Sequence, residues 1–261
     1  MLRSLNEILE YRLQATDDKI GRVKDFFFDD HSWVVRYLVA DTGTWLRGRM
    51  VLISPESFQE PNWSEHTVPV NLTTQQIERS PSVASDQPVS RQKEIEVTGY
   101  YRWPMYWTHL GVPAVGAMPV GVAPRGAKDA RKVSQTPQVE TAVARGEPTL
   151  RSFEEVSGYH IQAVDDEIGH VEDLVADTDG WRIRYLVVDT RNWLPGKKVL
   201  VAPDWIRDIS WDANQVKVDL TREKIKDAPE FDPSSPVNRE YEARLYDYYG
   251  APRYWEDGQN A

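Results

Sequence analysis

The stretch Trp33-Val34-Val35-Arg36-Tyr37-Leu38-Val39-Ala40-Asp41 decides the fold, because β-branched and aromatic residues dominate it. It returns later in the chain as Trp181-Arg182-Ile183-Arg184-Tyr185-Leu186-Val187-Val188-Asp189. The alternation predicts a strand, with Trp33, Val35, Tyr37 and Val39 on one face. We expect that face to point into a core. Arg36 and Arg184 lie on the opposite face, where we expect them to meet solvent, a neighbouring carboxylate or a partner.

The repetition extends far beyond this strand. Residues 2–107 align with residues 150–255 without a gap, and about 40 of roughly 106 paired positions are identical. The sequence therefore predicts two similar units, here called the first and second repeat. The predicted organisation is a repeat with an aromatic tail (1–107), a flexible linker rich in Pro, Gly and Ala (108–149), a second such repeat (150–255) and a C-terminal tail (256–261).

Composition limits the classes of function. The chain has 261 residues, enough for two small domains, and a formal charge of -10 that disfavours nucleic-acid binding. Cysteine is absent, so disulfides and thiolate metal sites are excluded. The N-terminus lacks the pattern of a signal peptide, and the proline-interrupted stretch 110–127 is too short to cross a bilayer. A cytoplasmic location without a transmembrane segment is the default prediction.

Each repeat begins with strand and turn patterns. Residues 11–15 and 22–28 read as a hairpin around the acidic turn 16–21, and shorter strands are expected at 49–53 and 67–70. Short helices are then predicted at 71–77 and 219–225, with Thr73 and Thr221 as N-caps. Pro81 and Pro229 are expected to end these helices.

Both repeats finish with dense aromatic residues. The tails read Tyr100-Tyr101-Arg102-Trp103-Pro104-Met105-Tyr106-Trp107 and Tyr248-Tyr249-Gly250-Ala251-Pro252-Arg253-Tyr254-Trp255. Pro104 predicts an extended segment, and so many rings must cover something. Each tail either packs on one of the repeats or docks on a partner or a membrane interface, since Trp and Tyr are enriched at both. Without a basic cluster beside them, a protein partner is preferred, and peripheral membrane association stays open.

A set of motifs resembles the PRC-barrel family. They are Leu-Arg-Ser, Asp-Asp-x-Ile-Gly-x-Val-x-Asp, Trp-x-x-Arg-Tyr-Leu-Val and Val-Leu-(Ile/Val)-x-Pro, which begin at Leu2, Asp17, Trp33 and Val51. Second copies begin at Leu150, Asp165, Trp181 and Val199. The resemblance implies a fold class of all-β, with two tandem, strongly bent antiparallel barrels bearing short helical and extended aromatic tails.

The same resemblance suggests a role. The family includes the cytoplasmic part of the photosynthetic reaction-centre H subunit and ribosome maturation factors, and it implies protein contacts without family-wide catalytic residues. This chain lacks the H subunit's transmembrane helix and the maturation factors' separate N-terminal domain. The main hypothesis is a non-catalytic interaction or assembly module. An accessory role beside photosynthetic complexes and a role in ribosome maturation or RNA processing are the alternatives, and acidic charge disfavours the last.

Candidate chemical sites are few. The recurring pair Asp17-Asp18 and its copy Asp165-Asp166 could bind a divalent cation, but a turn explains them better. The recurring Asp25/Asp173, Asp29/Asp177 and Asp41/Asp189 are interpreted as strand ends before turns. None of the five histidines recurs, and no nucleotide-binding or hydrolase motif is present. We therefore predict no catalytic residue, no cofactor and no metal.

The candidate interaction residues are the tail aromatics, the strand arginines and a mid-repeat loop, where Trp45-Leu46 recurs as Trp193-Leu194. Alternatively, the loop tryptophans fold over the end of the barrel. The two repeats are also expected to pack as an internal pseudo-dimer, which would bury some of these rings. The predicted residues are Arg36, Trp45, Tyr100, Tyr101, Tyr106, Trp107, Arg184, Trp193, Tyr248, Tyr249, Tyr254 and Trp255.

Overall fold

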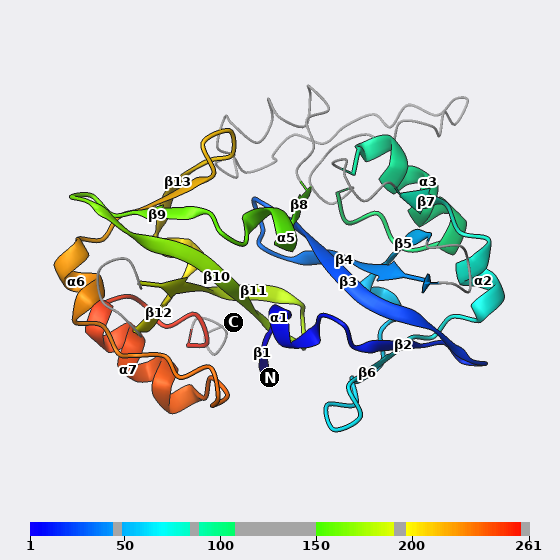
Figure 1. The fold of residues 1–261 in the computed structure, drawn as a ribbon, viewed down its shortest axis with the longest axis horizontal. Coiled ribbons are helices and arrows are strands. Elements are labelled where there is room, and N and C mark those ends of the chain that lie inside the picture. The colour runs from blue at the N-terminus through cyan, green and yellow to red at the C-terminus, as the bar shows by residue number, and fades with distance from the viewer. Residues whose placement is uncertain (44–48, 84–88, 108–149, 191–196, 257–261) are drawn as a thin grey trace, which may run out of the picture.

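The computed structural model describes residues 1–43, 49–83, 89–107, 150–190 and 197–256 (Figure 1). The loop residues Trp45, Leu46, Trp193 and Leu194 lie outside the described residues, as do the predicted linker 108–149 and most of the predicted C-terminal tail. Two sheets of seven strands each form the framework.

The first sheet has the order β6-β2-β3-β4-β5-β7. Its strands are β2 (Arg12–Gln14), β3 (Lys19–Asp29), β4 (Val35–Asp41), β5 (Met50–Ile53), β6 (Thr67–Pro69) and β7 (Ser82–Val83). The 3-10 turn η2 (Pro55–Ser57) follows β5, and the helices are α2 (Thr74–Glu78) and α3 (Arg91–Tyr101). β2 and β6 run parallel, whereas the other neighbours are antiparallel.

The second sheet has the order β12-β11-β10-β9-β14-β13. Its strands are β9 (His160–Gln162), β10 (Glu167–Asp177), β11 (Arg182–Asp189), β12 (Lys198–Val201), β13 (Ile206–Ser210) and β14 (Gln215–Val218). The turn η4 (Pro203–Trp205) and the helices α6 (Arg222–Lys226) and α7 (Arg239–Tyr249) complete it. The predicted hairpins and short helices are thus present, and Thr73 and Thr221 cap α2 and α6 as expected.

The prediction of two all-β barrels is confirmed only in part. The structure is mostly β, but neither sheet is closed. Helices α3 and α7 pack against the sheets and bury Val97 and Leu245 there, so helix rather than additional strand covers this apolar surface. Within the described residues, no helix is both long and apolar enough to cross a membrane.

The first hairpin requires glycine at one position in each repeat. A Cβ on Gly21 would lie 2.0 Å from the backbone oxygen of Asp41, and one on Gly169 would lie 2.0 Å from that of Asp189. Both glycines also have positive φ, +129° and +142°. The long strand β3 can therefore cross close to the end of β4 only because this position carries no side chain.

The central strand β4 is buried on both faces. It begins at Val35 rather than Trp33, because Trp33 has a left-handed φ of 56°. Tyr37 belongs to a small cluster under α3, while Leu38, on the opposite face, joins the main core and is 0% exposed. Alternation placed Tyr37 in a core, but it could not reveal that Leu38 is buried as well.

Each sheet receives its seventh strand from the other repeat. β1 (Leu2–Ser4) pairs with β10, and β8 (Leu150–Ser152) pairs with β3. A short helix follows each of these strands, α1 (Leu5–Ile8) and α5 (Phe153–Val156). Residues 2–8 and 150–156 are here called the first and second arm. Figure 1 shows the first arm along β10 and the second along β3, so the two repeats exchange equivalent segments.

The repeats also meet at their central strands. The Val35 amide donates to the Trp181 carbonyl at 2.8 Å, and the Ile183 amide donates to the Trp33 carbonyl at 2.7 Å. The Trp181 ring stacks on Phe26 of the first repeat, with 6.2 Å between ring centroids. The main hydrophobic cluster consequently contains residues of both repeats and forms one continuous core.

Candidate functional site

Both aromatic tails begin as helices. α3 and α7 start after Ser90 and Asn238, whose side chains accept hydrogen bonds from the amides of Lys93 and Tyr241. The expectation of extended tails was wrong for the first two aromatic residues of each tail, because the prolines come only after the helices have ended. Those residues are Tyr100, Tyr101, Tyr248 and Tyr249.

In the first repeat, a buried carboxylate ties the tail to the sheet. Glu94 on α3 is 2% exposed and accepts hydrogen bonds from the hydroxyls of Tyr106 at 2.6 Å and Tyr37 at 3.4 Å. The Arg91 guanidinium lies 2.9 Å from its other oxygen. Burial raises the pKa of Glu94 to about 7, although Arg91 and the hydroxyl of Tyr106 act to lower it. The network joins strand β4, helix α3 and the end of the tail.

The second repeat builds the same network. Glu242 on α7 accepts hydrogen bonds from Tyr185 at 2.7 Å and Tyr254 at 2.8 Å, and it pairs with Arg239 at 3.0 Å. Burial is the largest cause that raises the pKa of Tyr254 to about 12, so this phenol remains a hydrogen-bond donor at neutral pH. Equivalent residues thus make equivalent contacts in both halves of the chain.

Two arginines stack on each tail. Arg36 of β4 places its Cζ 4.0 Å from the ring centroid of Tyr106, and Arg91 places its own 4.4 Å from that of Trp107. The second repeat has Arg184 over Tyr254 at 4.0 Å and Arg239 over Trp255 at 4.3 Å. Each such contact contributes on the order of 1 kcal/mol. The strand arginines and tail aromatics, predicted as separate surfaces, are therefore one cluster in each repeat.

This cluster is called the tail clamp, and it comprises Arg36, Tyr37, Arg91, Glu94, Tyr106 and Trp107, or Arg184, Tyr185, Arg239, Glu242, Tyr254 and Trp255. Sequence analysis missed its arginine and glutamate on the tail helix. A signal was present, because Arg-x-x-Glu occurs at residues 91–94 and again at 239–242. Spacing of three residues on a helix brings the two side chains together.

An indole fills the same space from different positions in the two repeats. In the first, Trp103 stacks on Tyr101 with 4.1 Å between centroids, and its Nε1 donates to Ser57 Oγ at 2.8 Å. Ser57 is the last residue of η2, so the ring reaches from the tail toward that turn.

In the second repeat the indole comes from the turn instead. Trp205 occupies the position equivalent to Ser57, and Ala251 the position equivalent to Trp103. The Trp205 ring lies 4.4 Å from that of Tyr249. The two positions have changed together, which keeps one indole against the tail helix in each repeat.

Tyr100 and Tyr248 differ from the other predicted tail residues because they remain exposed, by 39% and 36%. Their hydroxyls donate to the carbonyls of Gln76 and Lys224 at 2.7 Å, which fixes each side chain over a short helix. Figure 1 places α2 with α3 at one end of the molecule and α6 with α7 at the other. Each end thus presents one anchored tyrosine.

The acidic turns act as helix caps. Asp17 accepts hydrogen bonds from the amide and hydroxyl of Thr74 at 2.7 and 2.8 Å, which lower its pKa, and Asp165 accepts one from the amide of Arg222 at 2.8 Å. Among the described residues, no group of three or more His, Asp or Glu is arranged to hold a metal ion. The hydrogen bonds of Asp17 and Asp165 to the helices that follow agree with the turn interpretation.

Asp25 and Asp173 do not end strands, contrary to the prediction. They lie within β3 and β10 and bind the exchanged arms. Ser152 Oγ donates to Asp25 at 2.5 Å, and Ser4 Oγ donates to Asp173. The predicted strand ends Asp29 and Asp41 are found as expected. Because Asp25 and Asp173 each bind a segment of the other repeat, no pattern in the neighbouring sequence indicates this role.

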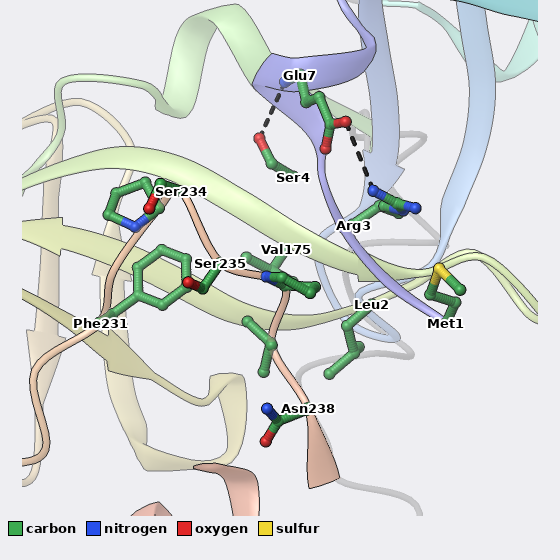
Figure 2. Close-up of a pocket in the computed structure, with 13 residues that line it drawn as sticks. Met1, Leu2, Arg3, Ser4, Glu7, Val175, Phe231, Ser234, Ser235 and Asn238 are labelled. Atoms are coloured by element: carbon green, nitrogen blue, oxygen red, sulfur yellow. Dashed lines mark hydrogen bonds and ion pairs between the residues drawn. The ribbon is translucent and has the colours of Figure 1, made fainter. Parts of the chain in front are cut away.

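A groove of about 450 Å³ runs beside the first arm (Figure 2). Its lining includes the apolar side chains of Leu2, Val175 and Phe231 and the hydroxyl-bearing Ser234 and Ser235. The charged side chains that line it, Arg3 and Glu7, face each other at 3.6 Å. The charged side chains of the groove are thus paired with each other.

Comparison with known families agrees with the motif analysis. The model of the PRC-barrel domain matches residues 149–225. The chain contains a PRC-barrel domain. The matched region runs from β8 to α6. It contains Arg184 and Tyr185 of the second tail clamp but ends before α7 and the tail, which carry the other four clamp residues. A search of curated proteins finds no match.

Proposed function

We propose that this PRC-barrel protein is a non-catalytic assembly module that binds a protein partner through its two ends. The observation that carries the proposal is the equivalent exposure of Tyr100 and Tyr248, each anchored over a short helix. An anchored tyrosine offers a large contact area at little cost in side-chain entropy. The arginine, tyrosine and glutamate side chains of the tail clamp bind one another and hold the tails, which favours a binding role over a catalytic one.

The proposal includes an internal pseudo-dimer. The support is reciprocal, since β1 pairs with β10 while β8 pairs with β3. Such an arrangement holds the two ends in a defined relation, as an isologous contact does in a homodimer. The first repeat is accordingly proposed as a second domain of the same type.

The test is an affinity capture with the full chain, followed by mass spectrometry. The variant combining Tyr100→Ala and Tyr248→Ala should lose a partner that the unchanged chain retains. Val164→Ala is the matched control, because Val164 is 50% exposed but lies outside the tails. If the tyrosine variant remains folded by circular dichroism and keeps every partner, the ends are not the binding surface.

A second comparison separates the ends from the clamp. Trp107→Ala combined with Trp255→Ala removes rings that stack on Arg91 and Arg239. We expect this variant to lose stability and to retain the partner under conditions where it is folded. If the folded clamp variant loses the partner, the binding surface includes Trp107 and Trp255 rather than Tyr100 and Tyr248 alone.

A further inference from the structure

Among the described residues, the donors to the two carboxylates that hold the exchanged arms are all uncharged. Asp25 accepts from Ser152 Oγ and from the Glu154 amide at 3.0 Å, and it is 7% exposed. Asp173 accepts from Ser4 Oγ, from the Asn6 amide at 3.0 Å and from the Leu174 amide at 2.7 Å. In the described part of the chain, neither carboxylate forms an ion pair with Lys or Arg.

Acidic side chains and cations that pair with other residues surround these carboxylates, and Lys24, which precedes Asp25 on β3, is exposed. Glu154 on the second arm raises the pKa of Asp25, and Glu172 on β10 raises that of Asp173. The cations nearby are engaged elsewhere: Lys198 pairs with Glu172 at 2.6 Å, Arg3 pairs with Glu7 and stacks on Trp63, and Arg151 pairs with Asp30 and stacks on Trp211. Asp25 is buried and Asp173 is half-buried, and desolvation raises the pKa of both carboxyl groups.

We propose that the two arms form a pH-responsive joint between the repeats. Each arm docks more tightly when the aspartate that holds it is protonated, and it loosens as that aspartate ionises. An undocked first arm would leave the edge of β10 at Val175–Asp177 without its strand partner, and an undocked second arm would do the same to β3 at Phe27–Asp29.

The direction of the effect follows from the pKa values. Burial raises the pKa of Asp173 to about 6 and raises that of Asp25 from its ordinary value of 3.8. The docked state thus binds the proton more tightly than the undocked state, so docking is strongest at low pH and weakens as pH rises through about 6. For the first arm, the opening equilibrium constant should rise about tenfold between pH 5 and pH 7.5.

Hydrogen–deuterium exchange of the full chain tests the proposal, with rates corrected for the intrinsic pH dependence of exchange. Amides of residues 2–8 should lose protection about tenfold between pH 5 and pH 7.5. Asp173→Asn should abolish this dependence for residues 2–8 and leave it unchanged for residues 150–156, which serve as the control. Unchanged pH dependence of the first arm in this variant would overturn the proposal.

A second variant gives a prediction of different form. Ser4→Ala removes one donor to the ionised carboxylate and also the cap of α1, where Ser4 Oγ accepts from the Glu7 amide at 2.9 Å. The first arm should lose protection at both pH values, but more at pH 7.5, because only the ionised aspartate depends strongly on that donor. If Ser4→Ala lowers the protection of residues 2–8 equally at the two pH values, the proposed pH-responsive joint is contradicted, even if Asp173→Asn fails to fold.

Discussion

The indole against the tail helix comes from Trp103 in the first repeat and from Trp205 in the second. A double-mutant cycle in the first repeat can therefore copy the arrangement that the second repeat already has. The perturbation is Trp103→Ala with Ser57→Trp, which would give the first repeat the arrangement found in the second. Because Trp103 is partly buried against Tyr101, its truncation should cost about 2–3 kcal/mol. The loss of its hydrogen bond to the buried Ser57 hydroxyl adds about 1 kcal/mol.

Ser57→Trp alone should be destabilising as well. The new ring would compete with the indole of Trp103 for one space, and overpacking of this kind costs about 1–3 kcal/mol. Independent effects would thus sum to about 5 kcal/mol. If the space is shared, the double variant should lose less than about 2 kcal/mol, which implies a coupling energy near 3 kcal/mol.

Urea unfolding of the four proteins, followed by far-ultraviolet circular dichroism, measures this coupling without relying on tryptophan fluorescence. The matched cycle is Trp205→Ser with Ala251→Trp in the second repeat, which should show the same sign. A double variant whose loss equals the sum of the single losses would refute the shared-space argument in that repeat.

Three further predictions concern single positions. Arg102, the C-cap residue of α3, has φ 62°, and the equivalent C-cap residue Gly250 of α7 has φ 67°. Arg102→Gly should therefore raise the free energy of unfolding by about 1 kcal/mol, whereas Gly250→Ala should lower it. Chemical denaturation measures both changes, and two changes of the same sign would contradict this expectation. Gly21→Ala should lower the melting temperature sharply, because its Cβ would meet the Asp41 carbonyl oxygen at 2.0 Å, and a change of a few degrees would be inconsistent with that contact. Burial raises the pKa of Glu94 to about 7, so its contribution to stability falls as pH rises from about 4.5 to 7. The free energy of unfolding of Glu94→Gln, relative to that of the unchanged chain, should therefore increase by up to about 3 kcal/mol between pH 5 and pH 8. A difference between the two proteins that stays constant over this range would contradict the raised pKa.

Local patterns predicted many elements of the fold correctly. The hairpin around residues 16–21 and the helices capped by Thr73 and Thr221 follow from short-range chemistry, because turn and cap preferences act within a few residues. The tail prolines wrongly predicted extended chain at Tyr100 and Tyr101, since helix α3 continues to Tyr101 and ends before Pro104. Barrel closure depends on pairing between distant strand edges, which no local pattern specifies.

The candidate site was predicted in part. The recurrence of Arg36 and Tyr106 in both repeats marked these residues, but not that the guanidinium lies over the ring. Glu94 escaped attention because a glutamate on a polar helix is ordinarily solvated, and its burial depends on strand β4 being covered by that helix.

By itself, the sequence determined that the chain is duplicated, that each copy is rich in strands and which residue types recur. Identity between the copies and alternation along strands can both be read from the order of residues in the chain. Only the tertiary structure decided that Ser4 meets Asp173 and that Ser152 meets Asp25. Either arm has the same motif, and its local sequence is compatible with docking on its own repeat or on the other. The choice is made by packing over long sequence separations, where burial of Leu2 and Leu150 and the pairing of strand edges act together.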